Sequence, residues 1–315
     1  MNDFKDRYIN FFTDFGFKKL FGSEPSKDCL IDFLNSLLEG MEEPIKELQF
    51  RKNEKLGSAA FDRKAIFDLY CESETGSRFI VELQKAKQNF FKDRSVFYST
   101  FPIQEQAQRG RDWDFRLDAV YTIGILDFVF DDDSDTPEKY LYNVKLSELE
   151  THEVFYDKLT FVYIEMPRFK KSLAELETHQ DKWIYALKNL SVLTDVPEGF
   201  REEVFMKFFD IAEIAQLDTK ERDAYEDSLK VYWDNINTMN FALQEAVKEA
   251  VQEAVQESLD KGRKEGVEIG VLKGRAEGEK AVSIKIAKNL LESGMSAEAV
   301  LEATAICVED INKLI

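Results

Sequence analysis

The chain has 315 residues, of which 44% are hydrophobic and 26 are Phe, and it carries a net charge of −19. This composition predicts a folded protein with a large buried core, in one large domain or two modest ones. The three cysteines, Cys29, Cys71 and Cys307, are far apart, which excludes a disulfide framework and a paired-cysteine metal or redox site. The chain has neither a secretory pattern at its N-terminus nor an uncharged apolar run of about 18 residues. We therefore expect a cytoplasmic protein without a membrane segment.

The negative charge is unevenly distributed. Residues 1–120 hold 19 Lys and Arg against 21 Asp and Glu, whereas the remaining 195 residues hold 23 against 40. Overall acidity disfavours nucleic-acid binding, because phosphate affinity depends on Lys and Arg. One strip reverses the balance, with seven basic and four acidic residues; its basic members are Lys85, Lys87, Lys92, Arg94, Arg109, Arg111 and Arg116. This strip is either a solvated helix face or a surface that contacts a phosphate backbone.

The first 168 residues predict alternating helices and strands. Residues 13–40 have the pattern of a turn followed by a helix that ends at Gly40, and residues 86–108 have the pattern of a second helix. Strands are predicted at 47–72, 78–84, 119–130, 140–146 and 159–166, with an acidic loop after residue 130. We interpret residues 1–168 as an α/β core.

The chain becomes helical after Pro167. We expect a helical extension over 169–240, a helical connector over 241–280, and a tail of three short helices, resembling a helix-turn-helix, over 281–315. In the connector a small residue recurs every fourth position from Ala246 to Gly278. Four residues turn a helix by about 400°, so this stripe drifts about 40° per repeat. The stripe indicates either a homo-oligomer formed through the C-terminal helices or a solvated connector. Acidic side chains on the tail favour packing over DNA recognition.

The stretch FDLYCESETGSRFIVELQ, residues 67–84, predicts a strand hairpin with unusual polar residues. If Glu74-Thr75-Gly76 is the loop, with Gly76 in the left-handed conformation, facing residues have numbers that sum to 150, and Asp68 faces Glu82. One face would then carry only apolar side chains: Phe67, Leu69, Cys71, Phe79, Val81 and Leu83. The other face would carry Asp68, Tyr70, Ile80, Glu82 and Gln84.

Facing carboxylates repel one another, and a sheet normally avoids this pairing. A divalent cation between Asp68 and Glu82 would remove the conflict, and Mg²⁺ prefers carboxylate oxygen ligands and a substrate phosphate. Gln84 points to the same face and is placed to orient an attacking water. This arrangement suits metal-assisted phosphodiester cleavage. The alternative is that both acids are charges at the rim of a half-solvated sheet.

The pattern Asp68…Glu82-x-Gln84 resembles the PD-(D/E)xK nuclease superfamily. Specifically, the chain resembles the Rpn group of recombination-promoting nucleases, also described as PD-(D/E)xK nuclease family putative transposases. Further matching stretches are TDFGFKKLFG, FLNSLL, FIVELQ with Arg94 and Tyr98 downstream, FKKSLAELETHQDKWIYALKNL, IAEIAQLDTKERDAYEDSLKVYWDNINTM and IAKNLLESGMSAEAVLEAT. They extend over nearly the whole chain.

The resemblance implies a restriction-endonuclease-like core with an α-β-β-β-α-β unit and a mixed sheet flanked by helices, followed by an all-α C-terminal region. It implies that Asp68 and Glu82 ligate Mg²⁺, with Mn²⁺ as a substitute, and that Gln84 stands where most of the superfamily has Lys. Neutral Gln cannot stabilise negative charge on the phosphate as Lys does, so we expect a slower or more metal-dependent enzyme.

The resemblance also implies supporting residues. Candidates for an additional acid are Asp14, Asp28 and Asp32, of which Asp14 lies in the TDFGFKKLFG signature. Lys18 either contacts phosphate or is a surface lysine. The candidates for contact with the DNA backbone are Lys85, Lys87, Arg94 and Tyr98; the last two are four residues apart and alternatively buttress the sheet.

Other chemistries lack the residues they need. The only histidines are His152 and His179, and no phosphate-binding P-loop motif occurs. The sequence therefore favours a Mg²⁺-dependent DNA endonuclease linked to recombination or mobile elements. The alternative is a catalytically weak nuclease fold that acts as an oligomeric interaction module.

Overall fold

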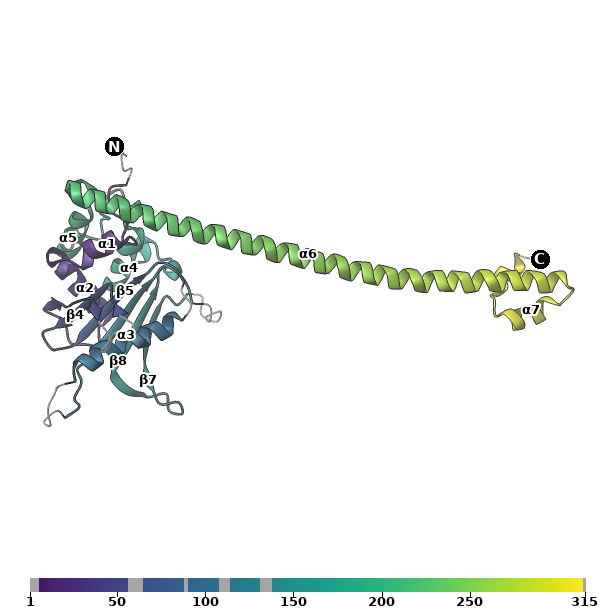
Figure 1. Cartoon of the computed structure of the whole chain (residues 1–315), viewed down its shortest axis with the longest axis horizontal. Helices are drawn as coiled ribbons and strands as arrows, with labels where there is room; N and C mark the ends of the chain where they lie inside the picture. Colours follow the sequence, from purple (N-terminus) through teal and green to yellow (C-terminus); the bar gives the residue numbers. More distant parts are fainter. Residues whose placement is uncertain (1–5, 56–64, 88–89, 108–113, 131–137, 314–315) are drawn as a thin grey trace. The chain divides into compact units, whose positions relative to one another are not determined.

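The computed structural model describes residues 6–55, 65–87, 90–107, 114–130 and 138–313 (Figure 1). The chain divides into two compact units, Met1–Asn235 and Ile236–Ile315. Among the described residues, no helix combines the length and the apolar character that crossing a membrane requires.

The first unit is built on a six-stranded mixed sheet in the order β1-β4-β5-β6-β8-β7. The strands are β1 (Leu48–Phe50), β4 (Leu69–Ser73), β5 (Arg78–Gln84), β6 (Val120–Leu126), β7 (Leu141–Ser147) and β8 (Val154–Glu165). Strands β5, β6 and β8 are mutually parallel, and the other pairings are antiparallel. A separate two-stranded sheet pairs β2 (Glu54–Lys55) with β3 (Ala65–Ile66). The strand predicted over 47–72 is therefore divided into four, and residues 56–64 lie outside the described ranges.

Helices cover both faces of the large sheet (Figure 1). On one side α1 (Asp14–Phe21), α2 (Lys27–Leu37), α4 (His179–Asn189) and α5 (Glu203–Ala212) pack against one another. The other face is covered by α3 (Phe91–Glu105). The helix predicted within 13–40 is α2, which ends at Leu37, and the turn predicted before it is instead α1 followed by a short 3₁₀ helix, Glu24–Ser26, with Pro25 in its first turn. The mixed sheet flanked by helices confirms the predicted fold class.

The hairpin of β4 and β5 has the predicted register. Leu69 pairs with Val81 and Cys71 with Phe79, and Gly76 in the connecting turn has a φ of +90°. One facial assignment was wrong: Phe67 packs with Tyr70 and Ile80 beneath α3. The cause is a bend between β3 and β4, which breaks the alternation of side chains that a continuous strand would impose.

The central strand β6 is buried along its whole length. This burial is expected for a strand whose two neighbours are parallel and whose two faces are covered by helices. Because β5 and β6 are parallel, their carboxyl ends, Gln84 and Leu126, lie side by side at one edge of the sheet. In open α/β sheets, ligands bind at this edge.

The second unit consists mainly of α6 (Thr219–Glu292), a helix of 74 residues that begins in the first unit. It is followed by α7 (Ala297–Thr304) and α8 (Val308–Asn312). The first of the three short helices predicted for the tail is thus the end of α6. Four buried residues form a small core for this tail: Ala287, Val300, Ile306 and Ile311.

Candidate active site

Asp68 and Glu82 lie together at the edge where β5 ends. The backbone N–H of Asp68 donates to Oε1 of Glu82 at 3.1 Å, and the backbone N–H of Leu83 donates to Oδ2 of Asp68 at 2.8 Å. Each carboxylate therefore accepts a hydrogen bond from the strand that carries the other. Asn53 stabilises the bend at Asp68, donating from Nδ2 to its carbonyl oxygen at 2.8 Å. The hairpin register and these reciprocal bonds hold the two acids in a fixed relationship.

Both acids are held in conditions that disfavour their charge. Glu82 is only 7% exposed, and its burial together with the negative charge of Asp68 raises the pKa of Glu82 to about 8. Burial likewise raises the pKa of Asp68, although the hydrogen bond from Leu83 acts against this. A buried carboxylate with an incomplete set of cationic partners is costly to ionise. The pair would be stabilised by additional positive charge.

Gln84 is occupied by two hydrogen bonds. Its Nε2 donates to the carbonyl oxygen of Ala86 at 3.1 Å, and its Oε1 accepts from Nη2 of Arg94 at 2.5 Å. The same Nη2 lies 3.8 Å from Oε2 of Glu82. Gln84 therefore fixes a guanidinium from α3 beside the catalytic candidates. The positive charge that a neutral residue 84 lacks is present at this edge of the sheet, supplied by a different element.

Aromatic rings confine the Arg94 side chain. Its guanidinium carbon lies 5.4 Å from the ring centroid of Phe91 and 5.5 Å from that of Tyr98. Tyr98 in turn packs edge-on against Phe67 at a centroid distance of 5.3 Å. Burial and the nearby charge of Glu82 raise the pKa of the Tyr98 hydroxyl. Tyr98 thus both buttresses the sheet and lies within the electrostatic range of the acidic pair.

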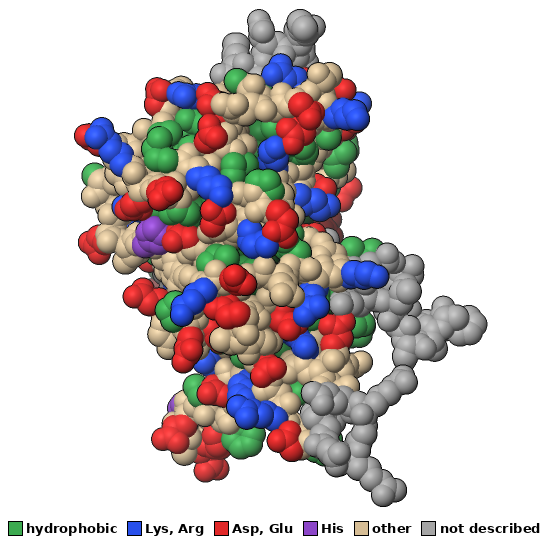
Figure 2. Space-filling view, turned by 90° about the vertical axis from the view of Figure 1, so that its left-hand side faces the viewer, with side chains coloured by type: hydrophobic (Ala, Val, Ile, Leu, Met, Phe, Trp, Pro, Cys, Tyr) green, Lys and Arg blue, Asp and Glu red, His purple; other side chains and the backbone are tan. Residues whose placement is uncertain are grey.

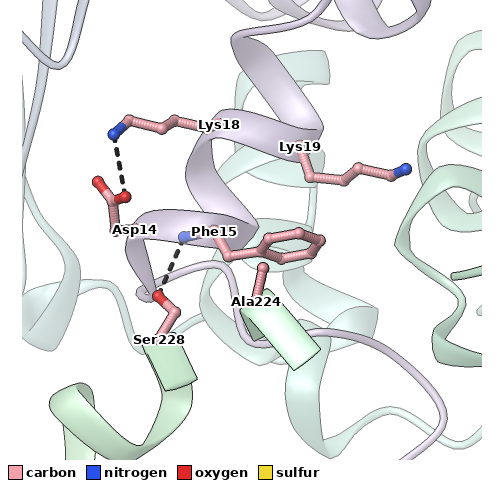
Figure 3. Close-up of a pocket in the computed structure, with 6 residues that line it drawn as sticks. All are labelled: Asp14, Phe15, Lys18, Lys19, Ala224 and Ser228. Atoms are coloured by element: carbon pink, nitrogen blue, oxygen red, sulfur yellow. Dashed lines mark hydrogen bonds and ion pairs between the residues drawn. The ribbon is translucent and has the colours of Figure 1, made fainter. Parts of the chain in front are cut away.

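Of the three candidates for an additional acid, Asp14 is the one near the pair. Its charge raises the pKa of Asp68, and it forms an ion pair with Lys18 at 2.9 Å (Figure 3). Asp28 instead pairs with Lys207 of α5, and Asp32 accepts a hydrogen bond from Nε1 of Trp183 at 2.7 Å. These last two acids join α2 to α5 and α4, on the side of the sheet opposite α3.

Asp14 and Lys18 also line a pocket of about 310 Å³ between α1 and the start of α6 (Figure 3). In that pocket the ring of Phe15 lies against Ala224, and the N–H of Phe15 donates to Oγ of Ser228 at 3.1 Å. The start of α6 thereby fixes the N-terminal end of α1, and with it Asp14. The position of Asp14 beside the candidate site therefore depends on α6, a helix that is distant in sequence.

Lysines from the predicted basic strip continue from β5. Lys85 is half-buried, and burial lowers its pKa while the charges of Asp14 and Asp68 act to raise it. Lys87 is exposed. Arg109 and Arg111 lie outside the described residues. On the face shown in Figure 2, acidic and basic side chains are interspersed, without a broad basic surface.

The donor set fits a hydrated divalent cation. Among the residues that the structure describes, there is no group of three or more His, Cys, Asp or Glu able to hold a metal ion. Mg²⁺ commonly uses only one or two protein carboxylates and completes its shell with water and substrate phosphate. Asp68 and Glu82 supply two such carboxylates, both with raised pKa values that a nearby cation would lower.

Comparison with known families decides the relationship. A family model described as PD-(D/E)XK nuclease family transposase matches residues 11–242. The chain belongs to this family. No curated protein matches the chain, and no solved structure matches it.

Membership in the PD-(D/E)XK nuclease family transposases supports a nuclease-like function linked to mobile elements and a hydrolase that acts on nucleic acid. Nucleases of this family generally use divalent metals. The match includes the core, α1 to α5, and the first part of α6, and it ends before the tail. The sequence singled out Arg94 but did not indicate its contact with Gln84; the signal available was the helical spacing of Arg94 and Tyr98.

Proposed function

We propose that the protein is a Mg²⁺-dependent DNA endonuclease that hydrolyses phosphodiester bonds. The observation that carries this proposal is the pair of Asp68 and Glu82, each of which accepts a backbone hydrogen bond from the strand segment of the other. Glu82 is buried and Asp68 half-buried at the carboxyl edge of the sheet, and both have raised pKa values. Perturbed carboxylates of this kind, in a nuclease-family fold, are typical of functional sites.

Asp68 and Glu82 would hold the cation, with Mn²⁺ able to replace Mg²⁺. When bound, the ion supplies Lewis-acid stabilisation of the phosphate and lowers the pKa of the attacking water. The fixed register of the hairpin keeps the carboxylates in place before substrate arrives, so little reorganisation is needed.

Arg94 would stabilise the negative charge that develops on the phosphate oxygens. Gln84 acts on Arg94 by accepting its hydrogen bond, and the rings of Phe91 and Tyr98 restrict the remaining freedom of the guanidinium. An arginine can bind two phosphate oxygens at once, which a single lysine ammonium does less well. The predicted loss of charge at residue 84 is thereby offset.

Lys18, Lys85 and Lys87 would contact the DNA backbone on either side of the cut. Asp14 would hold Lys18 in position through their ion pair, or join the metal shell through water. These contacts add affinity without base specificity.

The test is cleavage of supercoiled plasmid DNA by the full chain with Mg²⁺ or Mn²⁺. Wild type is compared with Asp68→Ala and Glu82→Ala, and with Asp93→Ala as a control that removes an exposed acid from the first turn of α3. We expect both site variants to lose at least about 10³-fold in rate, as when a charge-stabilising group essential to the transition state is removed. The control should retain activity.

Cleavage that survives both site substitutions would overturn the assignment of the active site. Absence of cleavage by well-folded wild type with every metal would instead favour the second hypothesis, a catalytically weak nuclease fold that acts as an interaction module.

A further inference from the structure

Phe90 has an unusual backbone conformation for its residue type. It immediately precedes α3 with a φ of 63° and a ψ of 30°, in the left-handed region, and its side chain is 77% exposed. Left-handed geometry is unfavourable for residues with a β-carbon, and glycine or asparagine normally occupies such positions. A bulky ring that gains no burial offers the folded chain no compensation for this strain.

The neighbouring contacts hold Phe90 in this conformation. Its carbonyl oxygen accepts from the N–H of Arg94 at 2.9 Å, in the first turn of α3. The next residue, Phe91, is 6% exposed, and its ring contacts Phe128 and Tyr163 at centroid distances of 5.9 and 6.0 Å. Burial of Phe91 and the start of the helix therefore fix the backbone and leave the ring of Phe90 in solvent.

Phe90 also lies in the short segment between two parts of the candidate active site. Six residues before it, Gln84 ends β5; four residues after it, Arg94 donates to Gln84. Lys87 is exposed in the same segment, and Lys92 follows with its Nζ 4.9 Å from the ring centroid of Phe130. The exposed ring of Phe90 thus has lysines on both sides in the sequence. Its backbone is hydrogen-bonded to Arg94, the residue that would contact the scissile phosphate.

We propose that Phe90 inserts between adjacent base pairs of duplex DNA beside the cleaved phosphodiester. Apolar side chains that enter DNA in this way unstack a base step and bend the duplex. Insertion would bury the exposed ring. It would also account for the strained backbone of Phe90, because strained conformations cluster at functional sites. This inference rests on the proposed function, because it takes DNA as the bound partner.

The chain contains a matched control. Phe115 has a φ of 64° and is also 77% exposed. It precedes β6, whose first residue is Val120, and so lies toward the edge of the sheet opposite to Gln84. Removing either phenylalanine takes away the same exposed ring from a residue with nearly the same positive φ, at opposite edges of one sheet.

The experiment measures DNA untwisting by the full chain without cleavage. Closed circular plasmid is saturated with protein in EDTA, saturation is verified by gel shift, and the DNA is relaxed with a topoisomerase that needs no metal ion. We expect wild type and Phe115→Ala to leave plasmid with a reduced linking number after protein removal. Phe90→Ala should lose most of this change and about tenfold or more in DNA affinity, since stacking on an aromatic ring contributes strongly to binding. Phe90→Trp should retain the change.

Phe90→Gly separates DNA insertion from a packing role. Glycine relieves the left-handed strain, so this variant should melt at or above the temperature of wild type while losing the topological change. A lower melting temperature with normal untwisting would show that the ring serves the fold and would overturn the proposal. If wild-type protein at saturation leaves the linking number of the plasmid unchanged, the proposal is also overturned. A protein partner would then be favoured as the contact of the ring.

Cleavage of linear and plasmid DNA with Mg²⁺ is measured in parallel. Untwisting that depends on Phe90 without any cleavage would support insertion while rejecting the nuclease activity. Cleavage with untwisting equal in wild type and Phe90→Ala would support the activity while rejecting insertion.

Discussion

Glu82 and Asp181 are both buried acids of the first unit, yet their surroundings differ sharply. Asp181, 1% exposed, accepts from the hydroxyl of Tyr140 at 3.0 Å and from Nζ of Lys171 at 2.7 Å. Its backbone and side chain also complete the capping box at the start of α4. Glu82, 7% exposed, accepts from the N–H of Asp68, and the guanidinium of Arg94 lies 3.8 Å from its other oxygen.

The difference is visible in the pKa values. Hydrogen bonds from Lys171 and its other partners outweigh burial at Asp181 and lower its pKa, whereas burial and the charge of Asp68 raise the pKa of Glu82. An acid that serves the fold has its full set of partners within the chain. The acid at the candidate site has an incomplete set, which a bound cation would complete.

The largest expected effect is a difference in unfolding free energy between variants of Asp181 and variants of Glu82. Asp181→Ala leaves Lys171 and Tyr140 without their shared acceptor, so we expect a loss of about 3 to 5 kcal/mol in unfolding free energy. Glu82→Gln replaces a buried carboxyl, whose pKa is about 8, by a neutral group of the same shape, so stability should fall by less than about 1 kcal/mol or rise. Urea unfolding at pH 7.5, followed by tryptophan fluorescence, measures both.

Asp181→Asn provides the matched control, since it keeps the shape of Asp181 and lacks only the charge. Its free energy of unfolding should lie between those of Asp181→Ala and wild type. Equal destabilisation by Asp181→Ala and Glu82→Gln would break the comparison and make Glu82 a structural residue.

The second effect concerns the cation that reaches Glu82 from α3. Arg94→Met should reduce the cleavage rate by about 10²-fold, comparable with removal of one preorganised charge-stabilising donor. Adding Gln84→Lys should recover part of this loss, because it places an ammonium on the strand that already carries Glu82. Rates of plasmid cleavage under single-turnover conditions give the double-mutant cycle.

Arg94→Met and Gln84→Lys are first checked for unchanged melting temperatures. Independent, additive effects of the two substitutions would contradict the idea that a cation from either position serves the same phosphate.

Most of the fold follows from local sequence patterns. The register of the hairpin could be predicted because loop length and Gly76 determine which residues face each other. The position of Phe67 could not be, since the bend at Asp68 interrupts the alternation of side chains on which the prediction depended. Likewise α1 lies in the part of residues 13–40 that the sequence predicted as a turn, and Pro25 belongs to the 3₁₀ helix that separates it from α2.

The site shows the same limit at the level of side chains. Asp68 and Glu82 are brought together by neighbouring strands, so their proximity follows from register alone. Asp14 and Arg94 reach the site from helices whose orientation depends on tertiary packing. Spacing on α3 predicts that Arg94 and Tyr98 share a face, but not that the guanidinium ends on Gln84.

The third effect tests whether a cation completes the surroundings of Glu82. Saturating Mg²⁺ should stabilise wild type by about 2.7 kcal/mol at a concentration near 100 times its dissociation constant, since only the folded chain presents the paired carboxylates. The shift should be lost in Asp68→Asn and Glu82→Gln and kept in Asp181→Asn. Melting temperatures with Mg²⁺, and again after addition of EDTA, measure it. An equal shift in all variants would indicate a binding site elsewhere.

The smallest effect comes from Asp127, whose charge compensation is intermediate between that of Asp181 and that of Glu82. It follows β6, its N–H donates to the carbonyl oxygen of Gln84 at 2.9 Å, and it lines a pocket of about 390 Å³ with Lys188. Burial raises the pKa of its carboxyl to about 6, and the charge of Lys188 acts against this without fully offsetting it. Asp127 therefore resembles Glu82 in having too little compensating charge, but among the described residues no acid raises its pKa as Asp68 raises that of Glu82.

Because the pKa of Asp127 is raised in the folded state, its contribution to stability is fully present below its ordinary value of 3.8 and is lost as pH rises through about 6. Asp127→Asn should thus match wild type near pH 4 and be more stable by about 1 to 2 kcal/mol at pH 7.5. Urea unfolding from pH 4 to 8 measures the difference, with the exposed Asp93→Asn as a control that should show none. A stability difference that does not change with pH would mean that the Asp127 carboxylate has sufficient partners when charged, and that incomplete compensation at this edge is confined to the pair of Asp68 and Glu82.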